Sequence, residues 1–222
     1  MSSLISIGLS GLSASQAHLS VTSNNIANAA TSGYSRQQAM QVAGASQYMG
    51  AGFLGSGTTL ADVRRIYSAY LDNQLQTATS LQADSTAFRD QVTGVDKLLA
   101  DRDTGISSVL TAFFSAMQTA AAKPGDVASR QLLLTQAQTL SNRFNAVSTQ
   151  LNQQNDVINS QLDTLAGQVN KLTSSIAEYN KQIVAASGTG STPNNLLDAR
   201  SEAVRQLNEL VGVTVQEREG NY

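Results

Sequence analysis

The chain has 222 residues with 14 Lys and Arg, 16 Asp and Glu, one His and no Cys, which gives a formal net charge of −2. This balance argues against nucleic acid and anionic membranes as partners, because both require clustered basic residues. Without Cys the chain can form no disulfide, thiolate nucleophile or sulfur-ligated metal site, and with only 14% charged residues its surface is predicted to be polar but largely uncharged.

Residues 3–30 are predicted to form an amphipathic helix with a narrow apolar stripe. The stripe consists of Ile5, Leu9, Leu12, Leu19 and Ile26, four of which recur every seven residues. Small residues lie among them, so an isolated helix would be only marginally stable in water. The pattern indicates a segment that becomes ordered against other subunits, with a helix docked on its own domain as the alternative.

Residues 31–65 interrupt the helical period and are predicted to form an irregular and partly β-structured segment. Turn residues come first, and alternation then places Arg36, Gln38, Met40 and Val42 on one face of a strand. Five glycines between positions 44 and 57 break any longer element. The stretch 58–65 is expected to be extended again.

Three helices are predicted in the next part of the chain. Apolar residues at spacings of three and four indicate a long helix over residues 66–100. After a break at 101–105, a shorter helix covers 106–123 and stops before a proline. Asp126 is placed to cap the next helix, which runs to about residue 186 and would be on the order of 90 Å long.

The longest helix carries two seven-residue repeats, which together are typical of a coiled-coil seam. The seam consists of Leu151, Ile158, Leu162, Leu165, Val169, Leu172, Ile176, Tyr179 and Ile183. It could form an intrachain core or an intermolecular zipper, and the neighbouring helices favour the core. The sequence therefore predicts a mainly α fold, an elongated rod of long antiparallel helices with coiled-coil-like packing.

The last part of the sequence predicts one more helix and then a strand. Thr192 and Pro193 are expected to supply the cap and the first-turn residue of a helix that Gly212 closes. Residues 213–218 are typical of a strand, and a turn follows. Because a strand requires a partner, we expect these residues to open a β-rich outer domain of a longer protein.

The sequence contains no combination of side chains that predicts catalysis, a cofactor or a metal site. The lone His18 lies on the N-terminal helix with no acid near it in sequence. Asp101 and Asp103 lie in a turn at a helix end. The glycines within residues 50–57 resemble a phosphate loop only superficially, because no Lys-Ser or Lys-Thr pair follows them. The sequence therefore predicts that the protein is not an enzyme and needs no cofactor or metal.

Three stretches of the chain resemble a known family. The run after the first helix contains Asn24, Asn25, Ile26, Ala27, Asn28, Gly33, Tyr34, Ser35 and Arg36. It resembles the signature of bacterial flagellar rod, hook and hook-associated proteins. The tract at 194–200, followed by residues 210–215, resembles the family of hook-associated protein 1, as does the stretch 67–75. With the helical pattern between them, the resemblance covers nearly the whole chain.

This resemblance implies a structural protein of the flagellum that joins the hook to the filament. Members of the family leave the cell unfolded through the flagellar type III export channel, so the protein would be secreted and extracellular. The first thirty residues contain no cleavable signal peptide, and that export route needs none. The N-terminal helix would pair with a C-terminal helix in the inner tube of the flagellum, and residues 24–36 would form the turn where the chain leaves that tube.

The resemblance also implies partners and domains. The partners would be copies of the chain in a ring or helical layer, hook protein and hook-associated protein 3, with no nucleic acid and no membrane. An export chaperone would bind through a C-terminal region that this sequence lacks. The domains would be an assembly helix at 1–30, a junction segment at 31–65, a helical rod domain at 66–211 and the start of a truncated β-rich domain at 212–222.

Two alternatives come from other classes of protein. A flagellin-like filament subunit is disfavoured by the residues at 24–36 and 192–213. A cytoplasmic signalling helical bundle would carry many more charged residues on its exposed positions than this chain has.

Overall fold

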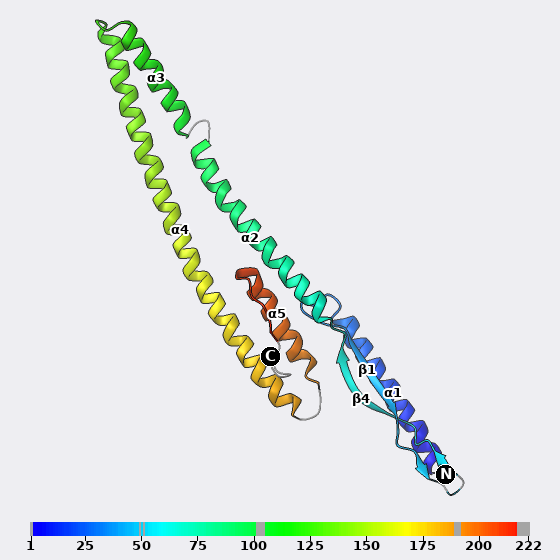
Figure 1. Cartoon of the computed structure of the whole chain (residues 1–222). Helices are drawn as coiled ribbons and strands as arrows, with labels where there is room; N and C mark the ends of the chain where they lie inside the picture. The colour runs from blue at the N-terminus through cyan, green and yellow to red at the C-terminus, as the bar shows by residue number, and fades with distance from the viewer. Residues whose placement is uncertain (1, 49, 51, 101–104, 189–191, 217–222) are drawn as a thin grey trace. The chain divides into compact units, whose positions relative to one another are not determined.

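The computed structural model describes residues 2–48, 50, 52–100, 105–188 and 192–216. In this part of the chain, five helices and four short strands follow in the order α1, β1 to β4, α2 to α5 (Figure 1). Helices make up 74% of the described residues. The prediction of a mainly α fold with a small β segment after the first helix is therefore confirmed.

Contacts divide the chain into two compact units. The first unit comprises residues 1–80 and 169–222, and the second comprises residues 81–168. The helices α2 (Ala69–Ala100) and α4 (Val127–Ser187) contribute residues to both units. The domain boundaries inferred from the sequence stay predictions.

The first unit begins with α1 (Ser2–Ala27), which lies against β1 (Gln37–Ala43) and β4 (Thr58–Arg65). The two strands form an antiparallel pair, with Ala61 of β4 left out of the register as a bulge. Of the four residues expected to share one face, Gln38, Met40 and Val42 lie in β1 and are exposed. The other face buries Gln37 and Ala39.

The length of β1 matches the length of α1 that lies beside it. Asn25 contacts the start of β1 at Gln37, whereas Ser10 contacts the start of β4 at Thr58, which pairs with the end of β1. Ser10 and Asn25 are fifteen positions apart, which is about 22 Å along a helix, and Gln37 and Ala43 at the two ends of β1 are six positions apart, which is about 20 Å along a strand. The helix and strand can therefore be tied together at both ends, and they run in opposite directions.

A small second sheet lies between β1 and β4 in the sequence. It pairs β2 (Gln47–Tyr48) with β3 (Phe53–Leu54). Gly57, which follows it, has a φ of 97° and no space for a side chain, because a Cβ there would come within 2.2 Å of Ser10 Oγ. The chain therefore passes closer to α1 at this point than any residue with a side chain allows.

The second unit is formed by the end of α2, by α3 (Ile106–Ala122) and by the first part of α4. A short turn joins α3 to α4, and within this unit the first part of α4 runs back beside α3 and the end of α2 (Figure 1). Asp126 caps α4 as predicted, because its Oδ2 accepts a hydrogen bond from the backbone N–H of Ser129 at 3.1 Å. An apolar groove lies between α2 and α4, with Phe88 on one side and Leu151 on the other.

The last helix, α5 (Asn194–Leu210), belongs to the first unit and buries Ala203, Val204 and Leu207. Two expectations about its ends are wrong. Thr192 does not cap the helix, because Pro193 occupies the cap position without a side-chain hydrogen bond, while Thr192 Oγ1 contacts Asp62 Oδ2 at 3.2 Å. At the other end Val211, not Gly212, closes the helix by donating its N–H to the carbonyl of Leu207.

The expected C-terminal strand is not seen in residues 213–216, and its remaining residues lie outside the described part of the chain. This difference has a physical reason, because a strand exists only where a neighbouring strand accepts its hydrogen bonds. The β-rich domain inferred from it stays a prediction.

The predicted seam of α4 is only partly covered by other parts of the chain. Its exposed members are Leu151, Leu162 and Leu165, and its half-buried members are Ile158, Val169, Leu172, Ile176, Tyr179 and Ile183. No seam residue is fully buried in the described structure. The role of the seam as an intrachain core stays a prediction.

The close approach at Gly57 generates a testable prediction. We expect Gly57→Ala to lower the free energy of unfolding of the first unit by about 1–3 kcal/mol, because the alanine meets both an unfavourable φ and Ser10. Urea unfolding followed by circular dichroism measures this change. The matched control is Gly55→Ala, because a Cβ at Gly55 meets no atom within 4 Å. Equal stability of the two variants would contradict the close approach.

Candidate assembly site

The helix α1 presents two different faces. Small or partly buried residues, among them Ser10, Ala14 and Val21, face β1 and β4. The predicted stripe lies on the rest of the surface, and every stripe residue is more than half exposed: Ile5, Leu9, Leu12, Leu19 and Ile26. Leu4, which sequence analysis did not include, is 77% exposed. The structure therefore shows the alternative considered from the sequence, a helix docked on its own domain, and the large apolar side chains of the stripe are exposed in the described structure. That these side chains become covered by other subunits stays a prediction.

The side chain of Asn25 attaches the end of α1 to the start of β1. Its Oδ1 accepts the backbone N–H of Gln37 at 2.8 Å, and its Nδ2 donates to the carbonyl of Gln37 at 2.8 Å. An amide is suited to this position because it combines an N–H donor with a carbonyl acceptor, as the backbone of a neighbouring strand does. The Asn25 side chain therefore makes the two hydrogen bonds with β1 that the backbone of a neighbouring strand would make.

Tyr34 supports this contact from the turn after α1. Its hydroxyl donates to Oδ1 of Asn25 at 2.8 Å and accepts a hydrogen bond from Nδ2 of Asn24 at 3.2 Å. Burial raises the pKa of the Tyr34 hydroxyl, and the negative charge of Asp198 raises it further. The hydroxyl therefore keeps its proton at neutral pH and remains a donor to Asn25.

The other residues of the run contribute to the turn itself. Asn28 Nδ2 donates to the carbonyl of Asn24 at 3.0 Å, and the Asn28 side chain also accepts from Thr31. Gly33 has a φ of 76°, and a Cβ at this position would lie 2.8 Å from Cβ of Glu202. Glycine is required here by both the backbone geometry and the close approach of α5. Ile26 and Arg36, by contrast, are exposed.

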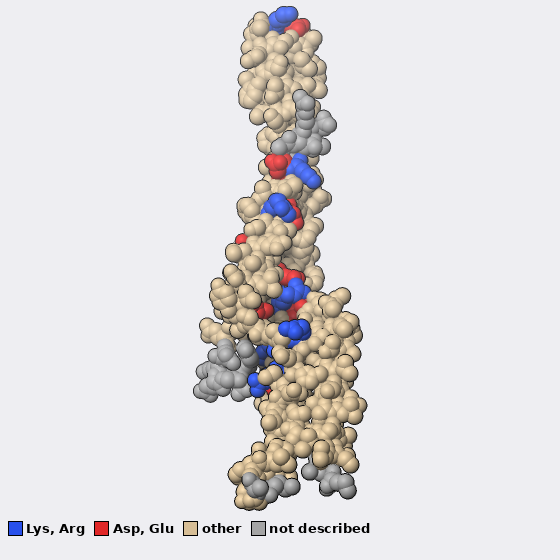
Figure 2. Space-filling view, turned by 90° about the vertical axis from the view of Figure 1, so that its right-hand side faces the viewer, with Lys and Arg blue, Asp and Glu red and all other residues tan. Residues whose placement is uncertain are grey.

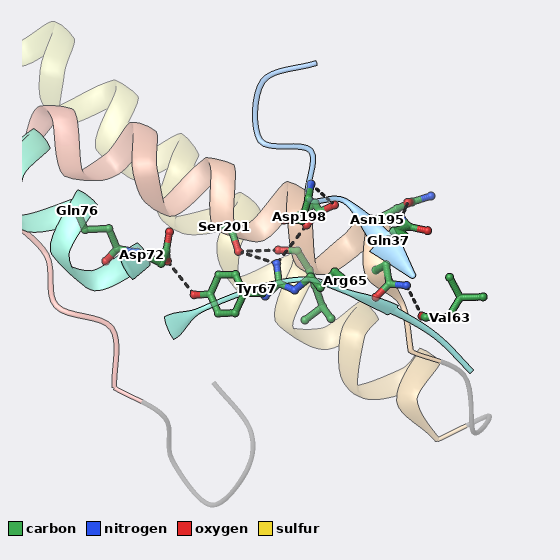
Figure 3. A network of polar contacts seen from close by, with 12 residues as sticks. Gln37, Val63, Arg65, Tyr67, Asp72, Gln76, Asn195, Asp198 and Ser201 are labelled. Atoms are coloured by element: carbon green, nitrogen blue, oxygen red, sulfur yellow. Dashed lines mark hydrogen bonds and ion pairs between the residues drawn. The ribbon is translucent and has the colours of Figure 1, made fainter. Parts of the chain in front are cut away.

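A buried ion pair connects this turn to β4 and α5 (Figure 3). Arg65 Nη1 lies 3.2 Å from Oδ1 of Asp198, and the two side chains are 9% and 8% exposed. The other oxygen of Asp198, Oδ2, accepts the backbone N–H of Ser35 at 3.1 Å. One carboxylate therefore joins three segments that are distant in the sequence.

The Arg65 side chain has further partners, as the close-up shows (Figure 3). Its Nη1 also donates to Oγ of Ser201 at 3.2 Å, and its guanidinium carbon lies 4.1 Å from the centre of the Tyr67 ring. The Tyr67 hydroxyl donates to Asp72 at 2.8 Å, at the start of α2. These contacts compensate for the removal of the two charges from water.

Glu202 forms a second polar contact between α5 and the turn. Its carboxylate binds Arg205 at 2.6 Å and accepts a weaker hydrogen bond from Ser32 at 3.4 Å. The hydrogen bond from Arg205 lowers the pKa of Glu202. The beginning of α5 is attached separately, because Nδ2 of Asn194 donates to the carbonyl of Val63 at 2.5 Å.

Sequence analysis assigned no role to Arg65, Asn194, Asp198 or Glu202. A signal was present, because charged residues are rare in this chain and Asp198 lies four residues after Asn194, on the same face of a helix. The signal was too weak to identify Arg65 as the partner, since 133 residues separate the two.

The described residues include no group of three or more His, Asp or Glu that could hold a metal ion. His18 is half-buried on α1, and Gly57 leads into a strand instead of a helix. Asp101 and Asp103 lie outside the described residues. No helix in the described part combines the length and apolar character that crossing a bilayer requires.

Two family models match the chain. The model described as "Flagellar hook-associated protein FlgK helical domain" matches residues 92–222. The model described as "Flagella basal body rod protein" matches residues 5–34, which correspond to α1 and the turn as far as Tyr34. The exposed stripe and the Asn25 contact therefore lie largely within the second match, and Asp198 lies within the first.

Individual relatives agree with the family models. The chain is 38% identical over 223 residues to flagellar hook-associated protein 1 of Salmonella typhimurium, covering 99% of this chain and 40% of that protein. The corresponding proteins are 34% identical in Escherichia coli and 32% identical in Bacillus subtilis, covering 99% and 92% of this chain and 41% and 42% of those proteins. The chain thus spans about 40% of the length of the curated relatives it matches.

A solved structure also resembles this chain. The flagellar hook junction protein FlgK from Burkholderia pseudomallei matches with a TM-score of 0.60 and 35% identity. The match covers 68% of this chain and 26% of that chain.

The ion pair generates a prediction about stability. We expect Asp198→Asn to lower the free energy of unfolding of the first unit by about 3–5 kcal/mol, because it leaves the Arg65 charge buried without a partner. Urea unfolding measures this loss, and amide exchange of Ser35 reports the local opening. Asp163→Asn, at an exposed position of α4, is the control and should change stability little. A loss no larger than that of the control would show that the pair does not hold these segments together.

Glu202 generates a prediction about pH. The pKa of Glu202 is lower in the folded chain than the ordinary value of 4.5. The contribution of Glu202 to folding stability is therefore fully present above pH 4.5 and is lost as the pH falls through the folded-state pKa. We expect the stability of the first unit to fall on acidification below pH 4.5, and to fall less steeply in Glu202→Gln. Urea midpoints measured across this range test the slope. Glu178→Gln, which removes an equal charge from an exposed position of α4, is the control for the loss of a charge.

Proposed function

Because the chain belongs to the family of flagellar hook-associated protein 1, we propose that it is a structural subunit that joins hook to filament by packing against copies of itself. It performs no catalysis and requires no cofactor. It leaves the cell through the flagellar export channel and acts outside the cell. Its further partners are hook protein and hook-associated protein 3. Binding of an export chaperone stays a prediction from the resemblance.

The exposed stripe of α1 is the observation that carries this proposal. Five large apolar side chains, together with Leu4, lie on one helix without cover from the described chain. Each is worth about 1.5–3 kcal/mol only when another surface removes it from water. A row of exposed apolar side chains at seven-residue spacing is typical of a helix that packs against another helix. The stripe supplies the driving force for assembly.

The contacts at both ends of β1 give this stripe a defined orientation. Asn25 holds one end of the helix through Gln37, and Ser10 Oγ holds the other by accepting the N–H of Thr58 at 3.2 Å. The small-residue face is therefore turned inward, and the stripe is turned outward. A preoriented surface loses less conformational freedom on binding than a disordered one.

The polar contacts of Asp198 fix α5, a helix of the first unit, to the segments that hold α1. Asp198 binds the turn through Ser35 and β4 through Arg65. Residues 24–36 then act as a fixed bend between α1 and α5. This arrangement supports the proposed role of the turn as the place where the chain leaves the inner tube.

Self-association tests the proposal. We expect wild-type chains to associate as their concentration rises in sedimentation velocity experiments, and Leu12→Asp to remain monomeric because a charge in the stripe cannot be buried without a partner. Leu134→Asp is the matched control, since Leu134 is a similarly exposed leucine on α4. Circular dichroism should show unchanged helix content in both variants.

Two results would contradict the proposed assembly role. One is a wild-type chain that stays monomeric up to millimolar concentration. The other is a Leu12→Asp variant that associates as well as the Leu134→Asp control.

A further inference from the structure

The short link between β4 and α2 lies within one of the stretches that resemble the family. Ile66 still belongs to the β structure, because its backbone N–H donates to the carbonyl of Arg36 at 2.7 Å. The helix α2 begins at Ala69. Only Tyr67 and Ser68 lie between it and Ile66, and each has two soft backbone dihedrals. The backbone alone therefore does not fix the direction in which α2 leaves the sheet.

The Tyr67 side chain bridges this link, because its ring and its hydroxyl contact different elements. The ring lies against Arg65 at the end of β4, with the guanidinium carbon 4.1 Å from the ring centre. A guanidinium can stack on a ring with its face while the N–H groups at its edge donate hydrogen bonds. Arg65 uses its edge for Asp198 at 3.2 Å, and its side chain is 9% exposed. The ring therefore contacts a cation that the ion pair holds in position.

The hydroxyl of Tyr67 holds the first turn of α2. It donates to Oδ2 of Asp72 at 2.8 Å, and the same oxygen accepts a hydrogen bond from Nε2 of Gln76 at 2.8 Å. Gln76 is buried, with an exposed fraction of 6%. Asp72 lies in the first turn, where unpaired backbone N–H groups favour a negative charge. The carboxylate is therefore held by its own helix, and Tyr67 binds it from the link.

Few other charges are available to replace these contacts. Only 14% of the residues are charged, and Figure 2 shows that most of the visible face carries neither basic nor acidic side chains. Between Tyr67 and Ala83, Asp72 is the only charged residue. No Lys or Arg on the first turns of α2 can therefore replace the Tyr67 hydroxyl as the donor to Asp72.

These contacts form a continuous chain of side chains within the first unit. It runs from the backbone N–H of Ser35 through Asp198, Arg65 and Tyr67 to Asp72, and Figure 3 shows the last four following one another. Each member holds the next in one orientation, and polar contacts of this kind strengthen one another where water is largely excluded. The chain of contacts begins at the turn after α1 and ends in the first turn of α2.

We infer that Tyr67 is a positioning residue that couples the turn after α1 to the start of α2. The ion pair holds its ring and its hydroxyl holds Asp72, so a loss at either end weakens the other. The inference goes beyond the proposed function, because the coupling acts within one copy of the chain. In an assembled layer, the same coupling makes α1 and the start of α2 respond together when a neighbouring copy binds α1.

Amide exchange after removal of one hydroxyl tests the coupling. We expect Tyr67→Phe to speed exchange of the Ser35 N–H by about threefold or more, although the lost hydroxyl contacts Asp72 and not Ser35. Phenylalanine keeps a ring against Arg65, so the cation retains that contact. The matched control is Tyr70→Phe, because Tyr70 is 74% exposed at the start of α2, and this change should leave Ser35 exchange unaltered.

A purely local role of Tyr67 gives a different result. Exchange then becomes faster at Asp72, whose N–H donates to the carbonyl of Ser68 at 3.0 Å, and stays unchanged at Ser35. That result overturns the inference. Equal acceleration at Val204, in the middle of α5, overturns it as well, because it reports a general loss of stability.

A double-mutant cycle in urea unfolding measures the coupling from the other end. Asp198→Asn and Tyr67→Phe are measured separately and together. Independent losses add, whereas we expect the double variant to lose less than the sum, by a factor of about three or more in the unfolding constant. The reason is that Arg65 no longer fixes the ring once the ion pair is broken. Additive losses overturn the inference.

A milder variant keeps the cycle informative if Asp198→Asn leaves too little folded protein. Ser201→Ala removes one hydrogen-bond partner of Arg65 without leaving its charge unpaired. The same departure from additivity with Tyr67→Phe is expected, and additive losses again overturn the inference.

These results are independent of the proposed assembly role. Both experiments are made at concentrations at which the chain is monomeric. Failure of the coupling therefore leaves the assembly role standing, and a chain that never associates leaves the coupling standing.

Discussion

The ion pair between Arg65 and Asp198 is the contact on which the architecture of the first unit depends. Removing both charges from water costs several kcal/mol per ion, and the structure offsets this cost with defined partners. Ser35 donates a backbone N–H to the carboxylate, while Ser201 and the Tyr67 ring contact the guanidinium. The pair is stable only when the turn, β4 and α5 are all in place. It therefore makes the correct arrangement of three distant segments a single cooperative event.

This constraint explains why α1 can expose its apolar side without losing its position. The helix is held by polar contacts at its ends and by small residues along its length, so its large side chains are not needed for its own docking. A larger residue at Gly57 would separate the helix from β4. The residues on the inward face of α1 are small because β1 and β4 lie close to the helix. The large residues are thereby left exposed.

The few charged residues are distributed in the same way, between the internal contacts and the exposed surface of α1. Few charged residues occur in the sequence, and several of them lie in the polar contacts around α5: Arg65, Asp198, Glu202 and Arg205. The first 61 residues, which carry the proposed assembly surfaces, contain Arg36 alone. Charge is thus used where it specifies an internal contact and is nearly absent where uncharged surfaces are proposed to meet.

The sequence by itself determined the helices, the β segment after α1, the Asp126 cap and the stripe, because these depend on neighbours within a few residues. It did not determine the partners of Asn25, Arg65 or Asp198, or the Thr192 contact with Asp62 that replaced the expected cap. Those residues meet across as many as 163 positions. Periodicity reports which residues share a face, whereas only the folded chain decides which face is turned inward and what covers it.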